Sequence, residues 1–293
     1  MIKNFPAAQA VVEKIEQAGF EAVFVGGAVR DYYLKKPQHD VDIATSALPE
    51  EVKAIFKKTV DVGIEHGTVL ILDEGEPIEV TTYRTEGTYS DNRRPDEVQF
   101  VRTLAEDLKR RDFTINALAI CLNKDRFGQL VDPFQGMRDL ENRIIRTPLN
   151  PDITFSDDPL RMMRCIRFAT QLSFYIEEKT LNSIKANKER INIVSQERIV
   201  DELHKIMKSS KPSVGFKLLR ETGLLALILP EIEALNGVDP IQGKSHKDVY
   251  LHTLEVVDKM ATKTDNLWLR WAALLHDIGK PATKRFDSKI GWT

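Results

Sequence analysis

Residues 24–45 read FVGGAVRDYYLKKPQHDVDIAT, and the rest of the chain is interpreted around this stretch. Its pattern predicts a buried strand, a Gly-Gly turn, a short helix from about Ala28, a loop and a second strand. Backbone N–H groups at the start of such a helix, beside glycines that allow close approach, bind anions. The stretch therefore predicts a place where a phosphate binds.

Asp40 and Asp42 are separated by one residue in the second predicted strand. Because successive side chains of a strand point to opposite faces, we expect both carboxylates on one face, with Val41 and Ile43 in the core. Paired carboxylates bind one or two Mg2+ ions, which activate an attacking hydroxyl and stabilise a leaving pyrophosphate. Glu79, on a later predicted strand, is a candidate third ligand, and a solvated strand position explains it equally well. A Gly-Gly turn or an Asp-x-Asp is common alone, but together they predict a nucleotidyl-transfer site.

The GG-x-VRD and D-x-D elements match, as they stand, those of nucleotidyltransferases of the DNA polymerase β superfamily. In detail the chain resembles class II tRNA CCA-adding enzymes and bacterial poly(A) polymerases. The resemblance implies the α+β fold class: a head with a small mixed or antiparallel sheet and helices, followed by an all-α neck and body. It implies a catalytic head at 1–148, a base-recognising helical neck at 149–210, and a helical body with an incomplete HD domain at 211–293. It also implies that nucleotide is bound by Gly26, Gly27 and Arg30.

Composition sets wider bounds on the function. The chain has 293 residues, of which 42% are hydrophobic and 29% charged, and its net charge is −2. It is long enough for two or three domains, and its charge gives no global sign of nucleic-acid binding, which must rest on local basic faces. No apolar run approaches the ~18 residues that span a bilayer, and no targeting segment is evident, so we expect a cytoplasmic protein without a membrane partner. Cys121 and Cys165 lack the spacing of metal ligands, and we expect buried, reduced thiols.

Residues 108–122, LKRRDFTINALAICL, predict a helix on which Asp112 and Asn116 share a face. The basic residues beside them, Arg111 included, suit a triphosphate or an RNA backbone. For an isolated segment, a helix with a basic first turn is the simpler explanation. In context, RRDFTINA matches the family element implicated in recognising the ribose, so the resemblance makes Arg111 and Asp112 the leading candidates for that role. The preceding residues 84–102 are rich in loop formers and predict a long mobile loop, where Arg93 and Arg94 are candidates for ordering nucleotide or RNA.

A further helix is predicted for residues 155–171, FSDDPLRMMRCIRFATQ. Its inward stripe would hold Met163, Ile166 and Thr170, and a basic ridge along another side would hold Arg161, Arg164 and Arg167. Asp158 before Pro159 is equally typical of an N-cap followed by proline at the first helical position. The functional alternative is that Asp158 and Arg161, three residues apart, present an acceptor and a donor to the edge of one base.

This pair predicts a rule for base selection. Cytosine and adenine each show an amine donor beside a ring-nitrogen acceptor, which an aspartate and an arginine complement. Uracil and guanine show the reverse pattern, and each mismatch leaves buried polar groups unpaired at a cost of ~1–3 kcal/mol. The pair also matches the family's EDxxR element, except that Asp157 stands where glutamate is usual. The same resemblance assigns Glu197, Arg198 and Glu202, on a helix predicted at 193–207, to supporting the nucleotide pocket.

A second set of metal ligands is predicted near the end of the sequence. His252 lies on one predicted helix and His276-Asp277 follows another, which gives nitrogen and oxygen ligands suited to a divalent transition metal. An isolated His-Asp pair is usually structural. Here LHTLEVVD and HDIGKP resemble the HD phosphohydrolase domain behind some bacterial CCA-adding enzymes, in which a further Asp ligand lies well downstream. Because the sequence ends at Thr293, we expect a truncated HD domain that binds its metal poorly.

The leading hypothesis is a CCA tRNA nucleotidyltransferase. It would add CCA to the 3′ end of tRNA without a template, from CTP and ATP, by two-metal nucleotidyl transfer with Mg2+ and release of pyrophosphate. The alternatives within the class are a poly(A) polymerase and a CC-adding enzyme. From other classes, the alternatives are an HD phosphohydrolase and a non-catalytic RNA-binding protein. The sequence makes no prediction of the oligomeric state.

Overall fold

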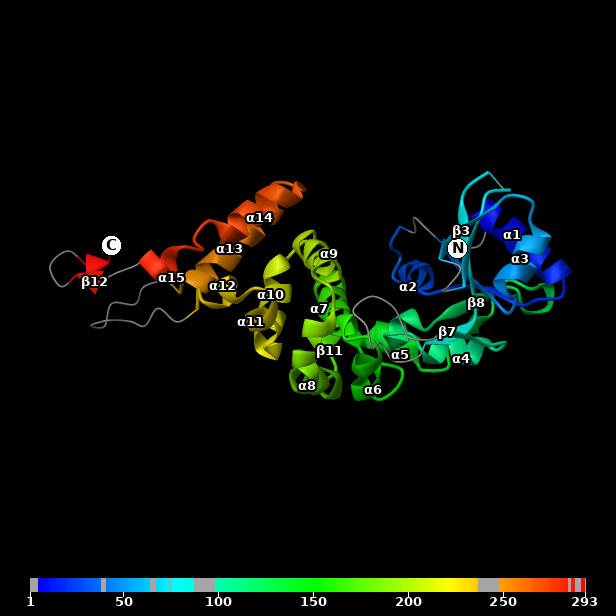
Figure 1. Ribbon diagram of the computed structural model, residues 1–293, viewed down its shortest axis with the longest axis horizontal. Helices are drawn as coiled ribbons and strands as arrows, with labels where there is room; N and C mark the ends of the chain where they lie inside the picture. Colours follow the sequence, from blue (N-terminus) through cyan, green and yellow to red (C-terminus); the bar gives the residue numbers. More distant parts are fainter. Residues whose placement is uncertain are drawn as a thin grey trace. The chain divides into compact units, whose positions relative to one another are not determined.

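The computed structural model describes residues 5–37, 41–63, 67–73, 75–86, 98–236, 248–283, 286–287 and 291–292. Of the candidate site residues named above, Asp40, Arg93 and Arg94 lie outside this part. The chain divides into two compact units, Met1–Asp158 and Pro159–Thr293 (Figure 1). Within the described residues, no helix is long and apolar enough to cross a bilayer.

A seven-stranded mixed sheet forms the centre of the first unit. Its strands, in the order in which they pair, are β3 (Thr59–Gly63), β4 (Thr68–Ile71), β5 (Ile78–Thr82), β2 (Asp42–Thr45), β1 (Ala22–Val25), β8 (Ala119–Cys121) and β9 (Leu130–Val131). β2 and β5 are parallel, and the other five neighbouring pairs are antiparallel. The expected α+β class and the mixed sheet are therefore confirmed.

The first unit also contains helices and short elements outside this sheet. They are α1 (Pro6–Gln17), α2 (Gly27–Tyr33), α3 (Pro49–Ile55), α4 (Leu104–Lys109), α5 (Gly136–Asn142) and α6 (Pro151–Asp157), the 3-10 turns η3 (Thr114–Asn116) and η4 (Lys124–Arg126), the hairpin β6 (Arg84–Glu86) and β7 (Val98–Phe100), and the short strand β10 (Ile144–Ile145). In α4, Leu104 and Leu108 belong to the same buried hydrophobic cluster as Val23 and Val25 of β1. This packing holds the residues that follow α4 next to the end of β1.

The helix predicted at residues 108–122 is wrong. α4 ends at Lys109, and the chain continues through η3 into β8, which pairs with β1 in the register Phe24↔Ile120. Ala119, Ile120 and Cys121 are all buried, so a central place in the sheet outweighs the helical propensity of this run. The predicted extent of the loop at 84–102 is also wrong, because residues at its two ends form the paired strands β6 and β7.

The second unit is built almost entirely from helices. They are α7 (Leu160–Leu172), α8 (Glu178–Asn187), η5 (Lys188–Ile193), α9 (Gln196–Met207), α10 (Pro212–Thr222), α11 (Leu224–Ile228), α12 (Pro230–Glu233), α13 (Val249–Ala261), α14 (Leu267–Leu275) and α15 (Lys280–Thr283), with the short strands β11 (Tyr175–Ile176), β12 (Phe286–Asp287) and β13 (Gly291–Trp292). Figure 1 shows α13 and α14 lying side by side. On α7, the predicted inward stripe of Met163, Ile166 and Thr170 is buried, which confirms that part of the prediction.

The single helix predicted at 155–171 is interrupted at its fourth residue. α6 ends at Asp157, Asp158 is extended with φ −141° and ψ 102°, and α7 begins at Leu160. The ring of Pro159 clashes with a helical conformation of the residue before it, which forces Asp158 out of the helix. Asp158 is therefore neither the N-cap of α7 nor on one helical face with Arg161.

Candidate nucleotidyl-transfer site

The Gly-Gly turn lies at the end of β1, where α2 begins. Gly26 has φ 73° and ψ −136°, a conformation that residues with a side chain rarely adopt. A β-carbon at Gly26 would lie 3.1 Å from Nη1 of Arg111 and 3.8 Å from Oδ2 of Asp42. The turn and the aspartate predicted from residues 24–45 therefore meet the arginine predicted from residues 108–122.

Asp42 is the first residue of β2, and its side chain is exposed. Val41 and Ile43 on either side of it are buried, so the predicted alternation is confirmed for the described residues. β2 pairs with β5 in parallel with Ile43 opposite Val80, and extending this register by one residue sets Asp42 beside Glu79. Glu79 is also exposed. Glu79 thus remains a candidate third ligand, whereas Asp40 lies outside the described residues.

A chain of hydrogen bonds joins α2 to the residues that follow α4. Nη1 of Arg30 donates to Oδ1 of Asn116 at 2.7 Å, and Nδ2 of Asn116 donates to Oδ1 of Asp112 at 2.9 Å. Arg30 also pairs with Asp31 through Nε and Nη2 at 2.9 and 3.0 Å. Asp112 and Asn116 are thus brought together as predicted, but by a turn and η3 and not by a helical face. The network fixes the Asp112 carboxylate near the start of α2.

Asp107 is a residue of this site that the sequence reasoning missed. It is fully buried in α4 and accepts hydrogen bonds from both Arg110 and Arg111. Burial raises the pKa of Asp107, but the two neighbouring guanidinium groups outweigh it and hold the pKa below its ordinary value. The spacing i, i+3 and i, i+4 in DLKRR was the available signal, since a carboxylate so placed on a helix reaches both arginines.

The arginines of α7 do not form an exposed ridge. Arg161 is buried, and Arg167 pairs through Nε with Oε2 of the buried Glu202 at 2.6 Å. The guanidinium carbon of Arg167 lies 4.0 Å from the ring centre of Phe168, and that of Arg164 lies 5.5 Å from it. Glu202 on α9 thus supports α7. Because Asp158 and Arg161 belong to different units, base reading by this pair stays a prediction.

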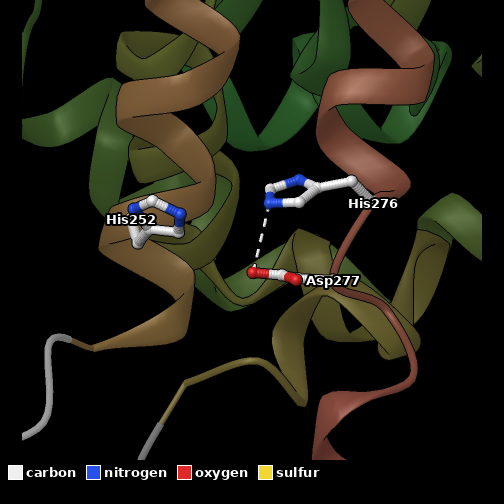
Figure 2. A group of neighbouring side chains, drawn as sticks. All are labelled: His252, His276 and Asp277. Atoms are coloured by element: carbon white, nitrogen blue, oxygen red, sulfur yellow. Dashed lines mark ion pairs between the residues drawn. The ribbon is translucent and has the colours of Figure 1, made fainter.

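The second metal constellation is present in the second unit. His252 of α13, His276 after α14 and Asp277 place one ligand atom each within 4.8 Å of one another (Figure 2). Nδ1 of His276 lies 2.7 Å from the carbonyl oxygen of Ala273, a contact that orients the ring and directs Nε2 away from that carbonyl. That nitrogen lies 3.1 Å from Oδ2 of Asp277. The set of two imidazole nitrogens and one carboxylate oxygen fits a divalent transition metal.

The Asp277 carboxyl is held in its anionic form, as a metal ligand requires. Partial burial raises its pKa, but the hydrogen bond from Lys280 at 2.7 Å and the positive charge around it lower the pKa below its ordinary value.

Comparisons with known proteins agree with this geometry. Family models match three successive segments: the poly A polymerase head domain at residues 22–146, a probable RNA and SrmB-binding site of polymerase A at 173–235, and the HD domain at 249–291. The CCA-adding enzyme of Pediococcus pentosaceus is 56% identical over 76% of this chain and 56% of its own length. That of Enterococcus faecalis is 59% identical over 75% of this chain and 53% of its own length. The chain spans about half the length of these relatives.

Solved structures show the same likeness. The crystal structure of the Bacillus stearothermophilus CCA-adding enzyme in complex with CTP has a TM-score of 0.72 and 40% identity, and the match covers 94% of this chain and 62% of that one. A tRNA nucleotidyltransferase complexed with a primer tRNA and an incoming ATP analog has a TM-score of 0.69 and 27% identity, over 91% of this chain and 75% of that one. The chain belongs to the tRNA nucleotidyltransferase/poly(A) polymerase family.

Proposed function

We propose that this chain adds CCA to the 3′ end of tRNA, using CTP and ATP and releasing pyrophosphate. The observation that carries the proposal is the meeting of Gly26, Asp42 and Arg111 at one point of the first unit. A glycine turn and a guanidinium suit the phosphates of a nucleotide, and a carboxylate beside them suits the metal that phosphoryl chemistry needs. The names of the relatives, which are CCA-adding enzymes, support this specific form of nucleotidyl transfer.

Different residues of the head bind the metal and the phosphates. Asp42 with Asp40, and Glu79 beside Asp42, supply the carboxylate oxygens that Mg2+ prefers. When bound there, Mg2+ lowers the pKa of the attacking hydroxyl and stabilises the leaving pyrophosphate. Arg111 and the Gly26-Gly27 turn hold the phosphates, so that the α-phosphate faces the end of the tRNA.

Sugar and base are selected by other groups. Asp112, held by Asn116, accepts a hydrogen bond from the ribose hydroxyl that a deoxynucleotide lacks. Asp158 and Arg161 read the base by the donor and acceptor rule given above, with Arg164 and Arg167 on the same helix as Arg161. Both Asp158 and Arg161 are buried, which makes a mismatched base costly.

The triad of His252, His276 and Asp277 holds, in this proposal, a second divalent metal. We place the protein in the cytoplasm, where tRNA and nucleoside triphosphates are at hand.

Incorporation of single labelled nucleotides tests the proposed function. Purified protein is incubated with Mg2+ and a tRNA that lacks its CCA end. We expect two additions from CTP alone, one further addition when ATP is also present, and none from UTP or GTP. Extended A-tailing of unrelated RNA would identify a poly(A) polymerase, and a stop after two cytidines with both nucleotides present would identify a CC-adding enzyme.

A further inference from the structure

Both oxygens of the buried Asp107 carboxylate are used for hydrogen bonds. Oδ2 accepts from Nε and Nη2 of Arg111, at 3.3 and 3.0 Å. Oδ1 accepts from Nε and Nη2 of Arg110, at 3.2 and 3.0 Å, and from the backbone N–H of Arg84 at 3.3 Å. One carboxylate thus joins two arginines to the first residue of β6. Because the side chain is fully buried, water does not compete for these bonds.

The contact with Asp107 decides how Arg111 is presented. A guanidinium is a planar, rigid fork, and two of its three nitrogens, Nε and Nη2, face Asp107. The third, Nη1, lies 3.1 Å from the position of a β-carbon at Gly26. Once the first two nitrogens are fixed, the plane of the fork fixes Nη1 as well. The fork therefore points at the Gly26 turn in the absence of any ligand.

We propose that Asp107 is a positioning residue that orients Arg111 so that its Nη1 donates to the phosphate groups of the incoming nucleoside triphosphate at the Gly26-Gly27 turn. The inference rests on the proposed function for the identity of the ligand. Asp107 itself touches no nucleotide. Asp107 fixes the Arg111 side chain before the nucleotide binds. Binding therefore does not have to pay the entropy of ordering that side chain.

Because of Arg110, orienting Arg111 requires the negative charge of Asp107 as well as its hydrogen-bonding geometry. Arg110 and Arg111 bind the same carboxylate, so a neutral residue at position 107 leaves two positive groups side by side. Their repulsion drives Arg111 away from its place beside Gly26. An asparagine, which is close in size to aspartate, therefore removes the orientation with little change in packing.

The test compares Asp107→Asn with Glu106→Gln by isothermal titration with CTP in the absence of tRNA. Glu106 is the adjacent residue of α4 and is exposed, so it controls for the loss of one negative charge in the same helix. We expect Asp107→Asn to raise the Kd for CTP roughly tenfold while the Kd for tRNA changes less than twofold. Glu106→Gln should leave both within twofold of the starting protein. An unchanged Kd for CTP in Asp107→Asn would overturn the inference.

A double-mutant cycle separates positioning from a general structural role. If Asp107 acts through Arg111, then Asp107→Asn introduced into an Arg111→Ala background changes the Kd for CTP less than twofold further. Additive losses would overturn the inference. Where Asp107→Asn does not fold, Asp107→Glu moves the carboxylate by one methylene and keeps the charge, and a Kd equal to that of the starting protein would again contradict it.

CTP binding and nucleotide addition by the unsubstituted starting protein distinguish failure of the proposed function from failure of the inference about Asp107. If it binds CTP and adds nothing to tRNA, the proposed function fails while the effect of Asp107 on CTP binding remains measurable. If it adds nucleotides normally and Asp107→Asn binds CTP equally well, the inference about Asp107 alone is wrong. If it binds no CTP, both are wrong.

Discussion

Replacing Asn116 by alanine tests the network that joins α2 to the residues after α4. Asn116 is buried in η3 and is bonded on both sides, to Nη1 of Arg30 and to Oδ1 of Asp112. Alanine removes both bonds and leaves a buried guanidinium nitrogen and a buried carboxylate oxygen each short of a partner. Arg30 still pairs with Asp31, and Asp112 still accepts a hydrogen bond from the backbone N–H of Phe113, so each charged group retains a hydrogen-bond partner.

The expected cost follows from these contacts. Hydrogen bonds to charged groups contribute about 1.5–3 kcal/mol each, and the remaining partners limit the total loss to about 2–4 kcal/mol. For a unit of this size that corresponds to a fall in Tm of roughly 5–15 °C. Freed from Asn116, Asp112 should also distinguish ribose from deoxyribose less well, so we expect a smaller preference for CTP over dCTP.

The assay must report on the first unit. All three tryptophans, Trp268, Trp271 and Trp292, lie in the second unit, so intrinsic tryptophan fluorescence does not follow the head. Hydrogen exchange of the backbone amides of β1 and β8 is suitable, because both strands lie in the first unit. Asn142→Ala is the matched control, because Asn142 is exposed at the end of α5, and its cost should stay within about 0.5 kcal/mol. If Asn116→Ala costs no more than this control, the network does not hold the site together.

Three further predictions concern single residues. Gly26→Ala should destabilise the head by about 1–3 kcal/mol because of the positive φ at this position, and it should weaken CTP binding because the added methyl group pushes Arg111 aside. Gly75→Ala is the control: Gly75 has φ 91° and nothing near its β-carbon, so this variant should lower stability without changing CTP affinity. Equal CTP affinity in both variants would count against the site. Burial and the neighbouring Glu13 and Glu21 raise the pKa of Glu16 from 4.5 to about 7, so its stabilising contribution is complete below about pH 4.5 and is lost as the pH rises through about 7. Glu16→Gln should therefore stabilise the protein by about 1 kcal/mol more at pH 8 than at pH 4.5 in urea titrations, after allowance for screening, and an equal effect at both values would refute this. Co2+ titrated into the protein should give weak absorption bands, which His276→Ala should abolish. Dialysis should remove the Co2+ from the protein. Stoichiometric retention of Co2+ after dialysis would show that the site binds metal more tightly than we expect.

The parts of the fold that the sequence predicted well are those with strong local signals. The buried strand predicted before the Gly-Gly turn is present as β1, because four apolar residues in succession precede that turn. In the second unit, Gly223 with φ 80° ends α10, and Pro230 begins α12, so each helix boundary lies at a residue with a special backbone. Such features depend on the residues themselves and little on the rest of the molecule.

The errors arose where distant contacts decide the structure. β8 was predicted as helix because its run of alanine, isoleucine and leucine suits either state, and only its pairing with β1 settles the matter. Asp107 was missed for a related reason. Its partners are close in sequence, but its importance depends on Gly26, which lies 81 positions earlier.

Asp42→Ala tests the central claim most directly. The measurement is the rate of labelled CMP incorporation into a tRNA that lacks CCA, at saturating Mg2+, together with the Kd of the same variant for that tRNA. Because Asp42 supplies a metal ligand and does not hold the RNA, we predict that incorporation falls by at least a thousandfold while the Kd for tRNA changes less than threefold. A variant that still extends tRNA at the rate of the starting protein would contradict the account of the site.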